Sequence, residues 1–278
     1  MEMTKYSVLM SVYKKENASY LLEAVNSMLN QSVKPSEIVL VEDGPLTDEL
    51  YTAIDLLVHE NAHIFKIVKN EKNLGLGLAL AKGLKECSYE LVARMDTDDI
   101  ARSNRISKQL LEFENDDALS LCGGNIREFA ESVENTVGLR VVPVEDREIK
   151  KYIKNRCPFN HMTVMFKKSD VLKAGNYQHL LYNEDYLLWI NMLKVGCKFK
   201  NIPEVLVDVR VDTDFYADRR GGNQYFKSEK AIQDILLENK LINVFTYSKN
   251  ISIRFILEKM MTPEMRSFIF KHFARKRG

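Results

Sequence analysis

Residues 94–100 have the sequence RMDTDDI and place three carboxylates, Asp96, Asp98 and Asp99, directly after the apolar-leaning run of residues 89–93. A strand that ends in such a cluster presents hard oxygen ligands at the edge of a sheet, and Mg²⁺ and Mn²⁺ prefer such ligands. Aspartate is also common in the turn after a strand, because its side chain bonds its own backbone and can cap the next helix. Taken alone, the cluster leaves both interpretations open.

The chain before residue 100 alternates four times between a short apolar run and a segment of different pattern. Strands buried on both faces are continuous apolar runs, whereas apolar residues spaced three or four apart indicate a helix. This alternation predicts an α/β fold with a doubly wound, mostly parallel sheet, in which ligands bind beyond the carboxyl ends of the strands. The predicted strands cover residues 6–13, 37–41, 64–68 and 89–95, and the predicted helices cover residues 18–29, 46–57 and 73–84.

The pattern after residue 100 is less regular. From about Lys227 it is helical only, and residues 244–278 carry eight Lys or Arg against two Glu. We therefore expect one domain over residues 1–225 and a basic helical extension over residues 226–278. In between, helices are predicted at 103–113, 144–154, 169–174 and 183–195, strands at 119–129, 161–167 and 199–210, and a hairpin or loop strand at 133–142.

The composition is that of a soluble globular protein. The 278 residues are 45% hydrophobic and 28% charged, and the net charge of +1 gives no whole-molecule reason to expect a nucleic-acid partner. The sequence begins without the features of a signal peptide, and no run approaches the roughly 18 apolar residues of a spanning helix, so we expect a cytoplasmic protein. Cys87, Cys122, Cys157 and Cys197 lack metal or redox spacing, and we expect reduced, buried thiols.

Several short motifs follow one another along the chain, and these are Ser7–Tyr13, Val39–Gly44, Asn73-x-Gly75, Asp96–Asp99, His161–Met165, and Glu184-Asp185 with Leu188-Trp189. In their order and spacing, they resemble the inverting nucleotide-sugar glycosyltransferases of family 2, whose catalytic domain has the GT-A fold. The resemblance covers roughly residues 5–215 and is strongest to bacterial exopolysaccharide and O-antigen enzymes of the amylovoran type. It implies a nucleotide-sugar-binding half over residues 1–100 and an acceptor half over residues 101–225.

The resemblance also implies roles for the acidic residues. Asp96-Thr97-Asp98 matches the D-x-D motif of the family, so Asp98 would bind the Mn²⁺ or Mg²⁺ that bridges the donor diphosphate, and Asp96 would contact the ribose or the metal. Asp185 matches the general base of the family, with Glu184 as the second candidate, and stabilisation of the helix terminus is the alternative role for Asp185. A carboxylate within hydrogen-bond reach can take the proton of an attacking acceptor hydroxyl, and an unperturbed aspartate is already ionised at neutral pH.

Four further residues would complete the donor site on the same resemblance. Asp43 would hold the nucleobase with Tyr13 packed near it, and Glu42 and Asn73 would lie beside them. Glu42 departs from the family, which has aspartate there, and this leaves the detail of base recognition open.

A second departure concerns the diphosphate. Family members often have Ala-Arg-Asn where this chain has Ala79-Leu80-Ala81, so an arginine that could meet the diphosphate is absent. Lys82, Arg94 and Arg102 are the candidates to replace it. His161 is a candidate ligand of the metal, a phosphate or the acceptor, although a buried structural histidine is an equal alternative. Trp189 is expected to pack in the core.

The predicted activity is transfer of a sugar, most simply from a UDP-sugar, to a hydroxyl of a growing bacterial surface glycan that can be lipid-linked. The basic, amphipathic end of the chain would then lie on the anionic cytoplasmic face of the membrane. A dimerising or solvated helix is the alternative for this segment. A second D-x-D, at Asp212-Thr213-Asp214, is expected in a flexible acceptor-side loop.

Three other functions agree with single features of the sequence but not with their context. A sugar-phosphate nucleotidylyltransferase can share the sheet and the metal, but it usually carries a Gly-rich loop after the first strand, where this chain has Tyr13–Asn17 without glycine. His59-Glu60-Asn61-Ala62-His63 matches the H-E-x-x-H of zinc hydrolases, but it straddles a predicted helix end, whereas the motif needs one continuous helix. An inactive, binding-only relative is disfavoured by the intact D-x-D and Glu184-Asp185 pair.

Overall fold

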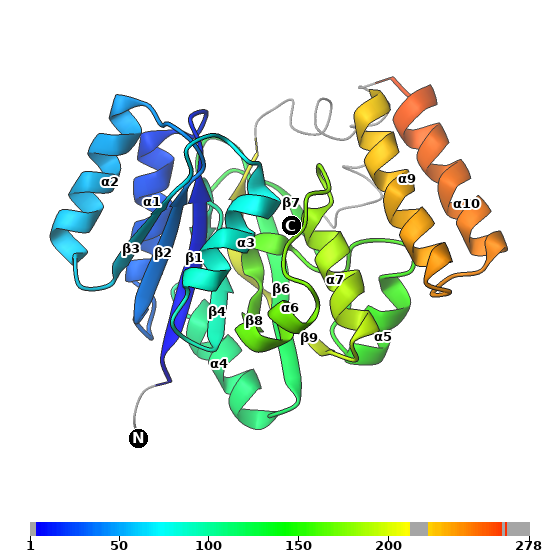
Figure 1. The fold of residues 1–278 in the computed structure, drawn as a ribbon, viewed down its shortest axis with the longest axis horizontal. Helices are drawn as coiled ribbons and strands as arrows, with labels where there is room; N and C mark the ends of the chain where they lie inside the picture. Colours follow the sequence, from blue (N-terminus) through cyan, green and yellow to red (C-terminus); the bar gives the residue numbers. More distant parts are fainter. Residues whose placement is uncertain (1–3, 212–221, 263–264, 266–278) are drawn as a thin grey trace.

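A mixed sheet of nine strands organises the part of the chain that the computed structural model describes, which is residues 4–211, 222–262 and 265. The strand order is β3-β2-β1-β4-β8-β6-β9-β5, and β7 pairs with β6 at one side of this path (Figure 1). The strands are β1 (Tyr6–Val12), β2 (Glu37–Glu42), β3 (Phe65–Lys69), β4 (Leu91–Arg94), β5 (Ile100–Ala101), β6 (Leu119–Phe129), β7 (Thr136–Arg140), β8 (Met165–Lys167) and β9 (Lys198–Arg210).

The first four strands in the order β3-β2-β1-β4 run parallel, as the alternating pattern predicts. The short strand β8 is antiparallel to both β4 and β6 and so joins this half to the long parallel pair of β6 and β9. The two-residue strand β5 follows the acidic cluster and pairs antiparallel with β9. The predicted α/β class and doubly wound arrangement are confirmed.

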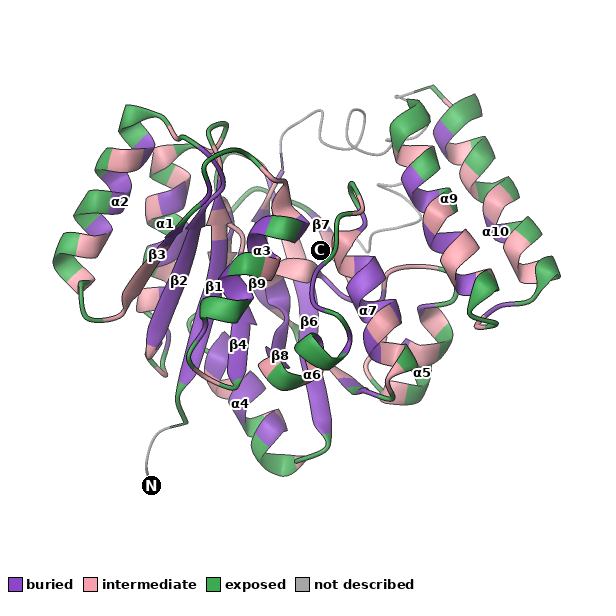
Figure 2. Ribbon diagram, viewed as in Figure 1, coloured by how far each residue is buried: buried purple, intermediate pink, exposed green. Residues whose placement is uncertain are grey.

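Helices cover both faces of the sheet, so that most strand residues are buried (Figure 2). One face packs against α1, α2 and α4, and the other packs against α3, α5, α7 and α9. The helices are α1 (Ala18–Leu29), α2 (Asp48–Asn61), α3 (Leu76–Glu86), α4 (Arg105–Asn115), α5 (Asp146–Tyr152), the 3-10 turn η1 (His161–Thr163), α6 (Lys168–Lys173), α7 (Glu184–Lys194), α9 (Gly222–Glu238), α10 (Val244–Phe255) and the π-helical turn η2 (Ile256–Met260).

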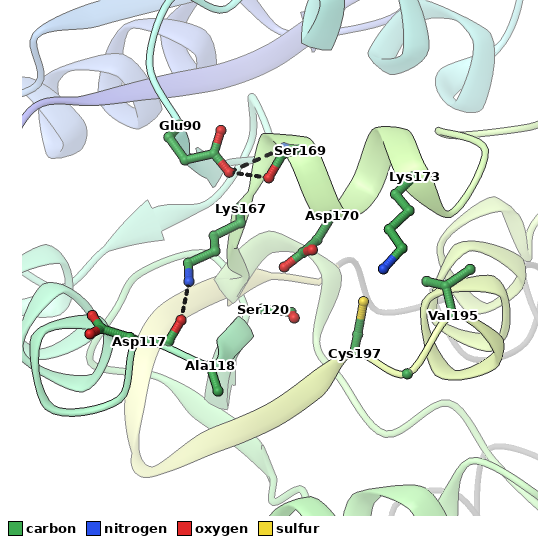
Figure 3. Close-up of a pocket in the computed structure, with 11 residues that line it drawn as sticks. Glu90, Asp117, Ala118, Ser120, Lys167, Ser169, Asp170, Lys173, Val195 and Cys197 are labelled. Atoms are coloured by element: carbon green, nitrogen blue, oxygen red, sulfur yellow. Dashed lines mark hydrogen bonds between the residues drawn. The ribbon is translucent and has the colours of Figure 1, made fainter.

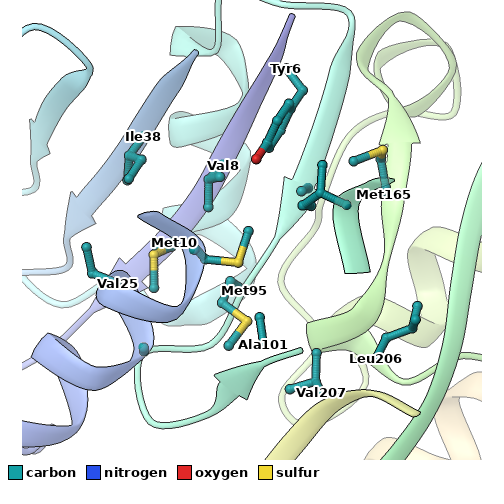
Figure 4. Close-up of a cluster of buried hydrophobic side chains, with 14 of the residues drawn as sticks. Tyr6, Val8, Met10, Val25, Ile38, Met95, Ala101, Met165, Leu206 and Val207 are labelled. Atoms are coloured by element: carbon teal, nitrogen blue, oxygen red, sulfur yellow. The ribbon is translucent and has the colours of Figure 1, made fainter. Parts of the chain in front are cut away.

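The two cores follow from the alternation of side chains along each strand. In β1, Val8 and Met10 are fully buried in the core beneath α1, α2 and α4 (Figure 4), whereas Leu9 between them faces α3. The approach of α3 is close, because a Cβ atom at Gly83 would lie 2.6 Å from Leu9 Cδ1 and 2.5 Å from Val41 Cγ2. A side chain at this position would push the helix off the sheet.

Most predicted elements are found, with two corrections. The strand predicted over residues 161–167 begins only at Met165, because residues 161–163 form η1, in which the Thr163 hydroxyl donates to the Asn160 carbonyl oxygen at 2.8 Å. The strands predicted over residues 199–210 are one continuous strand, β9. The hairpin prediction at 133–142 is confirmed by β7.

Other expectations have mixed outcomes. Cys87, Cys122 and Cys197 are buried free thiols as predicted, and Cys157 is a free thiol that is only partly buried. Over the described residues, the helices are too short or too polar to cross a bilayer. Residues 263, 264 and 266–278 of the predicted basic extension and the second D-x-D at residues 212–214 lie outside the described residues.

Arg105 joins α4 to the centre of the sheet from a fully buried position. Its Nη2 donates to the carbonyl oxygens of Arg94 at 2.7 Å and Val164 at 3.3 Å, and its Nε donates to Gln109 Oε1 at 3.0 Å. Gln109 in turn donates to the carbonyl oxygens of Cys122 and Thr163, both at 2.8 Å. Burial lowers the pKa of Arg105, because the charge has lost its water and is solvated by these dipoles instead.

We expect Arg105→Met to lower the free energy of unfolding by about 2 to 4 kcal/mol, because buried carbonyl oxygens and Gln109 lose their donor. Lys108→Met on the same helix is the matched control, since it removes the more exposed pair with Glu204 and should cost less than about 1 kcal/mol. Equilibrium urea unfolding measures both. Equal costs for the two variants would contradict the role assigned to Arg105.

Candidate active site

A cavity of about 480 Å³ lies at the carboxyl ends of β1, β2 and β4, the edge of the sheet where a ligand was expected. It combines carboxylates, two arginines, a histidine and two tyrosines. The lining residues are Ser11, Tyr13, Glu16, Asp43, Asn73, Gly75, Leu76, Arg94, Asp96, Thr97, Asp98, Asp99, His161, Met162, Tyr182, Val209 and Arg210.

Three carboxylates gather at one wall of this cavity. Asp96, Asp98 and Asp99 each offer an oxygen, and these oxygens lie within 4.8 Å of one another. Asp99 is buried, and the pKa of its carboxyl is raised well above the usual value, first by burial and then by repulsion from Asp98 and Asp96. A compact set of hard oxygen donors that repel one another fits a divalent cation such as Mg²⁺ or Mn²⁺.

Arg94 lies beside this cluster and is 1% exposed. Its Nη2 forms an ion pair with Asp96 Oδ1, and its Nε and Nη1 have no hydrogen-bond acceptor among the described residues. The other two candidates for the missing arginine are occupied elsewhere. Lys82 donates to Lys69 O and Asn70 Oδ1, and Arg102 binds Asp208. Of these three candidates, Arg94 alone lines the cavity.

Asp43 fixes the loop that leads into α3. Its Oδ1 accepts from Asn70 Nδ2 and the Leu74 amide, both at 2.9 Å, and its Oδ2 accepts from the Gly75 amide at 3.0 Å. An ionised carboxylate has about four acceptor positions, so Asp43 retains capacity for a ligand. Gly44 beside it has φ +88°, and a Cβ there would lie 2.6 Å from the Asn73 amide nitrogen.

The remaining predicted donor residues divide into two groups. Tyr13 and Asn73 line the cavity, and Asn73 Nδ2 also donates to the Asp43 carbonyl oxygen at 3.2 Å. Glu42 does not line the cavity. It is buried, and its Oε2 lies 3.3 Å from Lys69 Nζ on the neighbouring strand β3. The side chain of Glu42 therefore pairs with Lys69 on the neighbouring strand β3, whereas the side chain of Asp43 faces the cavity.

Asp185 stands in the first turn of α7, as predicted, and is partly buried. Its Oδ1 accepts from the Tyr186 amide at 2.7 Å, and the Cys157 thiol lies 3.6 Å from its Oδ2. Burial raises the pKa of Asp185, although these contacts and the charge of Arg140 oppose the rise. Burial and the neighbouring charge of Asp185 raise the pKa of Glu184 to about 7.

Asp185 and Glu184 do not line the cavity, but charged residues that line it affect the pKa values of both carboxyls. The positive charge of Arg94 opposes the rise in the pKa of both carboxyls, and the negative charge of Asp96 adds to the rise for Glu184. The charges that line the cavity therefore act on both carboxyls.

The loop before α7 is anchored to α9. Asn183 Nδ2 donates to Ser228 Oγ at 2.9 Å, and Ser228 Oγ donates in turn to the Leu181 carbonyl oxygen. Tyr182 has φ +70° and packs its ring 5.6 Å from that of Tyr225 on α9. A non-glycine residue in this conformation is strained, and the anchored ends of the loop hold it there.

His161 lines the cavity and accepts or donates a hydrogen bond at 3.0 Å with the Tyr177 hydroxyl. Burial, together with the charge of Arg94, holds the pKa of His161 well below its usual value, so the imidazole is neutral at pH 7. Trp189 is fully buried against Phe159, His161 and Tyr177, as predicted for a core residue.

Two other sites are weaker candidates. The H-E-x-x-H motif is divided, because α2 ends at Asn61 and leaves His63 outside the helix. A second pocket of about 530 Å³ lies at the opposite edge of the sheet, at the amino ends of β4, β6 and β9 (Figure 3). Both acidic and basic side chains line this pocket. Several of them are hydrogen-bonded, since Lys167 Nζ donates to the Asp117 carbonyl oxygen and the Ser169 hydroxyl donates to Glu90 Oε1.

The sequence did not predict that Tyr182 and Arg210 line the cavity. Tyr182 stands three positions before Asp185, in the loop that leads into α7. Arg210 reaches the acidic cluster from the end of β9, far away along the chain, and nothing in its local sequence indicated this contact.

Comparisons with known proteins agree with this geometry. A family model described as Glycosyl transferase family 2 matches residues 7–173. The chain is 37% identical over 266 residues to the amylovoran biosynthesis glycosyltransferase AmsE of Erwinia amylovora, with 96% of this chain and 98% of AmsE covered. It is 36% identical over 273 residues to the UDP-Gal:alpha-D-GlcNAc-diphosphoundecaprenol beta-1,3-galactosyltransferase of Escherichia coli, with 98% and 97% covered.

Solved structures show the same fold. S. aureus TarS 1-349 in complex with UDP-GlcNAc superimposes with a TM-score of 0.62 at 17% identity, with 96% of this chain and 75% of that chain covered. Identity this low supports the fold alone, and the expected GT-A fold is confirmed. AmsE confirms the resemblance to amylovoran-type exopolysaccharide enzymes. The O-antigen biosynthesis glycosyltransferase WbnJ of Escherichia coli is 28% identical over 213 residues, with 74% of this chain and 79% of WbnJ covered. This chain therefore belongs to glycosyl transferase family 2 and is a glycosyltransferase.

Proposed function

We propose that this protein is a metal-dependent, inverting glycosyltransferase that moves a sugar from a UDP-sugar to a hydroxyl of a bacterial surface glycan. The observation that carries the proposal is the cavity, which is lined by three clustered carboxylates and a buried arginine. Tyr182 also lines it, two positions before the helix that begins with Glu184 and Asp185. The E. coli galactosyltransferase is named for a UDP-Gal donor and a diphosphoundecaprenol-linked acceptor, which supports a UDP-sugar and a lipid-linked acceptor here.

Asp96 and Asp98, with Asp99 behind them, would hold the divalent metal. Such a metal, when bound, neutralises the charge that develops on the leaving nucleoside diphosphate. Arg94 would add a fixed positive charge next to the same phosphates, since two of its guanidinium nitrogens lack an acceptor among the described residues. Asp43 and Tyr13 would bind the nucleobase, with Asn73 beside them.

Asp185 would act as the general base that takes the proton of the acceptor hydroxyl. The Tyr186 amide fixes one carboxylate oxygen, Oδ1, and within the described part of the chain Oδ2 has only the weak thiol contact of Cys157. Oδ2 is therefore the oxygen suited to receive the proton. A single displacement, with the hydroxyl attacking from the face opposite to the leaving diphosphate, inverts the anomeric configuration.

The donor site can be tested without knowledge of the acceptor. We expect UDP with Mn²⁺ to raise the melting temperature of the full chain, and we expect Asp98→Ala to abolish this rise, because a ligand stabilises only the state that binds it. GDP and dTDP, each with and without Mn²⁺, identify the preferred nucleotide. Asp117→Ala, in the second pocket, is the control and should keep the full rise. Absence of a rise with all three nucleotides would refute the donor site.

The base can be tested by separating binding from turnover. We expect Asp185→Asn to keep the UDP- and Mn²⁺-dependent rise in melting temperature but to lower kcat at least about 100-fold, the scale of general base catalysis. Turnover of the unmodified protein should fall as pH decreases through the raised pKa of Asp185, because the protonated carboxyl cannot accept a proton. Glu184→Gln is the matched control, and a larger loss of kcat in that variant would transfer the role to Glu184.

The outer surface of α10 supports contact with a membrane. Phe245, Ile253, Ile256 and Met260 are 85%, 45%, 46% and 69% exposed and follow one another at near-helical spacing on α10 and η2. Lys249 lies on the same stripe and is exposed. The surplus of basic residues over positions 244–278 complements an anionic lipid surface, where a lipid-linked acceptor would be found.

We expect the full chain to co-sediment with phosphatidylglycerol vesicles and Phe245→Ser to weaken this binding about 10-fold, the scale of one partly inserted aromatic side chain. Leu56→Ser is the matched control, since Leu56 is 50% exposed on α2, and it should bind as the unmodified chain does. Equal binding of all three proteins would rule out α10 as the membrane contact.

A further inference from the structure

The acidic cluster lies on a short connection between β4 and β5, and its shape depends on what holds that connection. Affinity for a metal depends on residues that fix the ligands as well as on the ligands themselves. On the β4 side, Arg94 pairs with Asp96. On the other side, the main contacts come from Arg210, the last residue of β9, which also lines the cavity.

Arg210 bonds two successive residues of the cluster. Its backbone amide donates to Asp99 Oδ1 at 3.0 Å, and its Nε donates to the carbonyl oxygen of Asp98 at 3.3 Å. The first bond fixes a carboxylate, and the second fixes the backbone of the residue expected to bind the metal. Both contacts act on the orientation of the ligands.

The guanidinium of Arg210 is itself held from three sides. Its Cζ lies 3.9 Å from the ring centroid of Tyr20 and 4.8 Å from that of Phe129, and its Nη2 donates to Glu23 Oε2 at 2.6 Å. The side chain is only 11% exposed. A planar cation can stack on aromatic rings and donate from several nitrogens at once, whereas lysine is a point charge on a flexible stem.

We propose that Arg210 is a positioning residue for the metal site, which clamps Asp98 and Asp99 to α1 and β6 and sets the affinity for the divalent cation. This inference rests on the proposed function, because it requires the cluster to bind a metal. The Coulomb effect of a positive charge beside the site would oppose cation binding, so a benefit from Arg210 must come from geometry.

The test is a titration of the full-length protein with Mn²⁺ at a fixed concentration of UDP, with free Mn²⁺ counted by electron paramagnetic resonance. Arg210→Gln removes the side-chain bond to the Asp98 carbonyl oxygen and keeps the backbone amide that binds Asp99. We expect this variant to raise the half-saturating Mn²⁺ concentration about 10-fold, the lower end of the usual cost of losing a residue that orients metal ligands. Arg210→Lys should fall between this variant and the unmodified protein. Glu23→Gln, which keeps Arg210 but removes its ion pair, should raise the value a few-fold and serves if Arg210→Gln does not fold.

Arg254→Gln is the matched control. Arg254 pairs with Glu229 at 2.6 Å with the same 11% side-chain exposure, but it lies on α10, and its hydrogen bonds within the described part of the chain are to Glu229, Asn250 and Asn155. It should lower the melting temperature without changing the Mn²⁺ titration. An unchanged titration in both Arg210→Gln and Glu23→Gln, with Mn²⁺ bound normally by the unmodified protein, would overturn the inference alone. No Mn²⁺ binding by the unmodified protein would overturn the proposed metal site and this inference with it.

Discussion

The hydrogen bond from Arg105 Nη2 to the carbonyl oxygen of Arg94 is the contact on which the site depends most. It attaches α4 to the last residue of β4, the point where the chain leaves the sheet and the acidic cluster begins. Through Gln109, the same network reaches β6 and η1, so that both halves of the sheet share one buried polar centre. Such a network is costly when it is incomplete and specifies one arrangement when it is complete.

The two buried arginines also shape the electrostatics above them. Arg94 forms an ion pair with Asp96, and the pKa of Asp99 is raised, first by burial and then by repulsion from Asp98 and Asp96. Folding therefore holds carboxylates that repel one another close together, and this lowers the stability of the fold locally. A bound cation would offset the repulsion. Such local costs are common at functional sites.

The helical part after residue 222 supports the site. Ser228 on α9 anchors the loop of Leu181 and Asn183, and this loop leads directly into the turn that carries Asp185. Arg254 on α10 pairs with Glu229 on α9 and so holds the two helices together. A substitution on α9 or α10 can therefore shift Asp185 through this loop, even though the substituted residue itself is remote from the cavity.

The sequence by itself determined the α/β class, most helices and strands, and the presence of Asp96, Asp98 and Asp43 at one edge of the sheet, because periodicity and strand ends are local properties. It did not reveal that β8 runs antiparallel or that β9 is continuous, because strand pairing joins distant segments. It also placed Glu42 with the donor residues, although side-chain alternation turns it toward Lys69. The contact of Arg210 with the cluster was decided only by tertiary structure, since the pairing of β5 with β9 brings together residues more than a hundred positions apart.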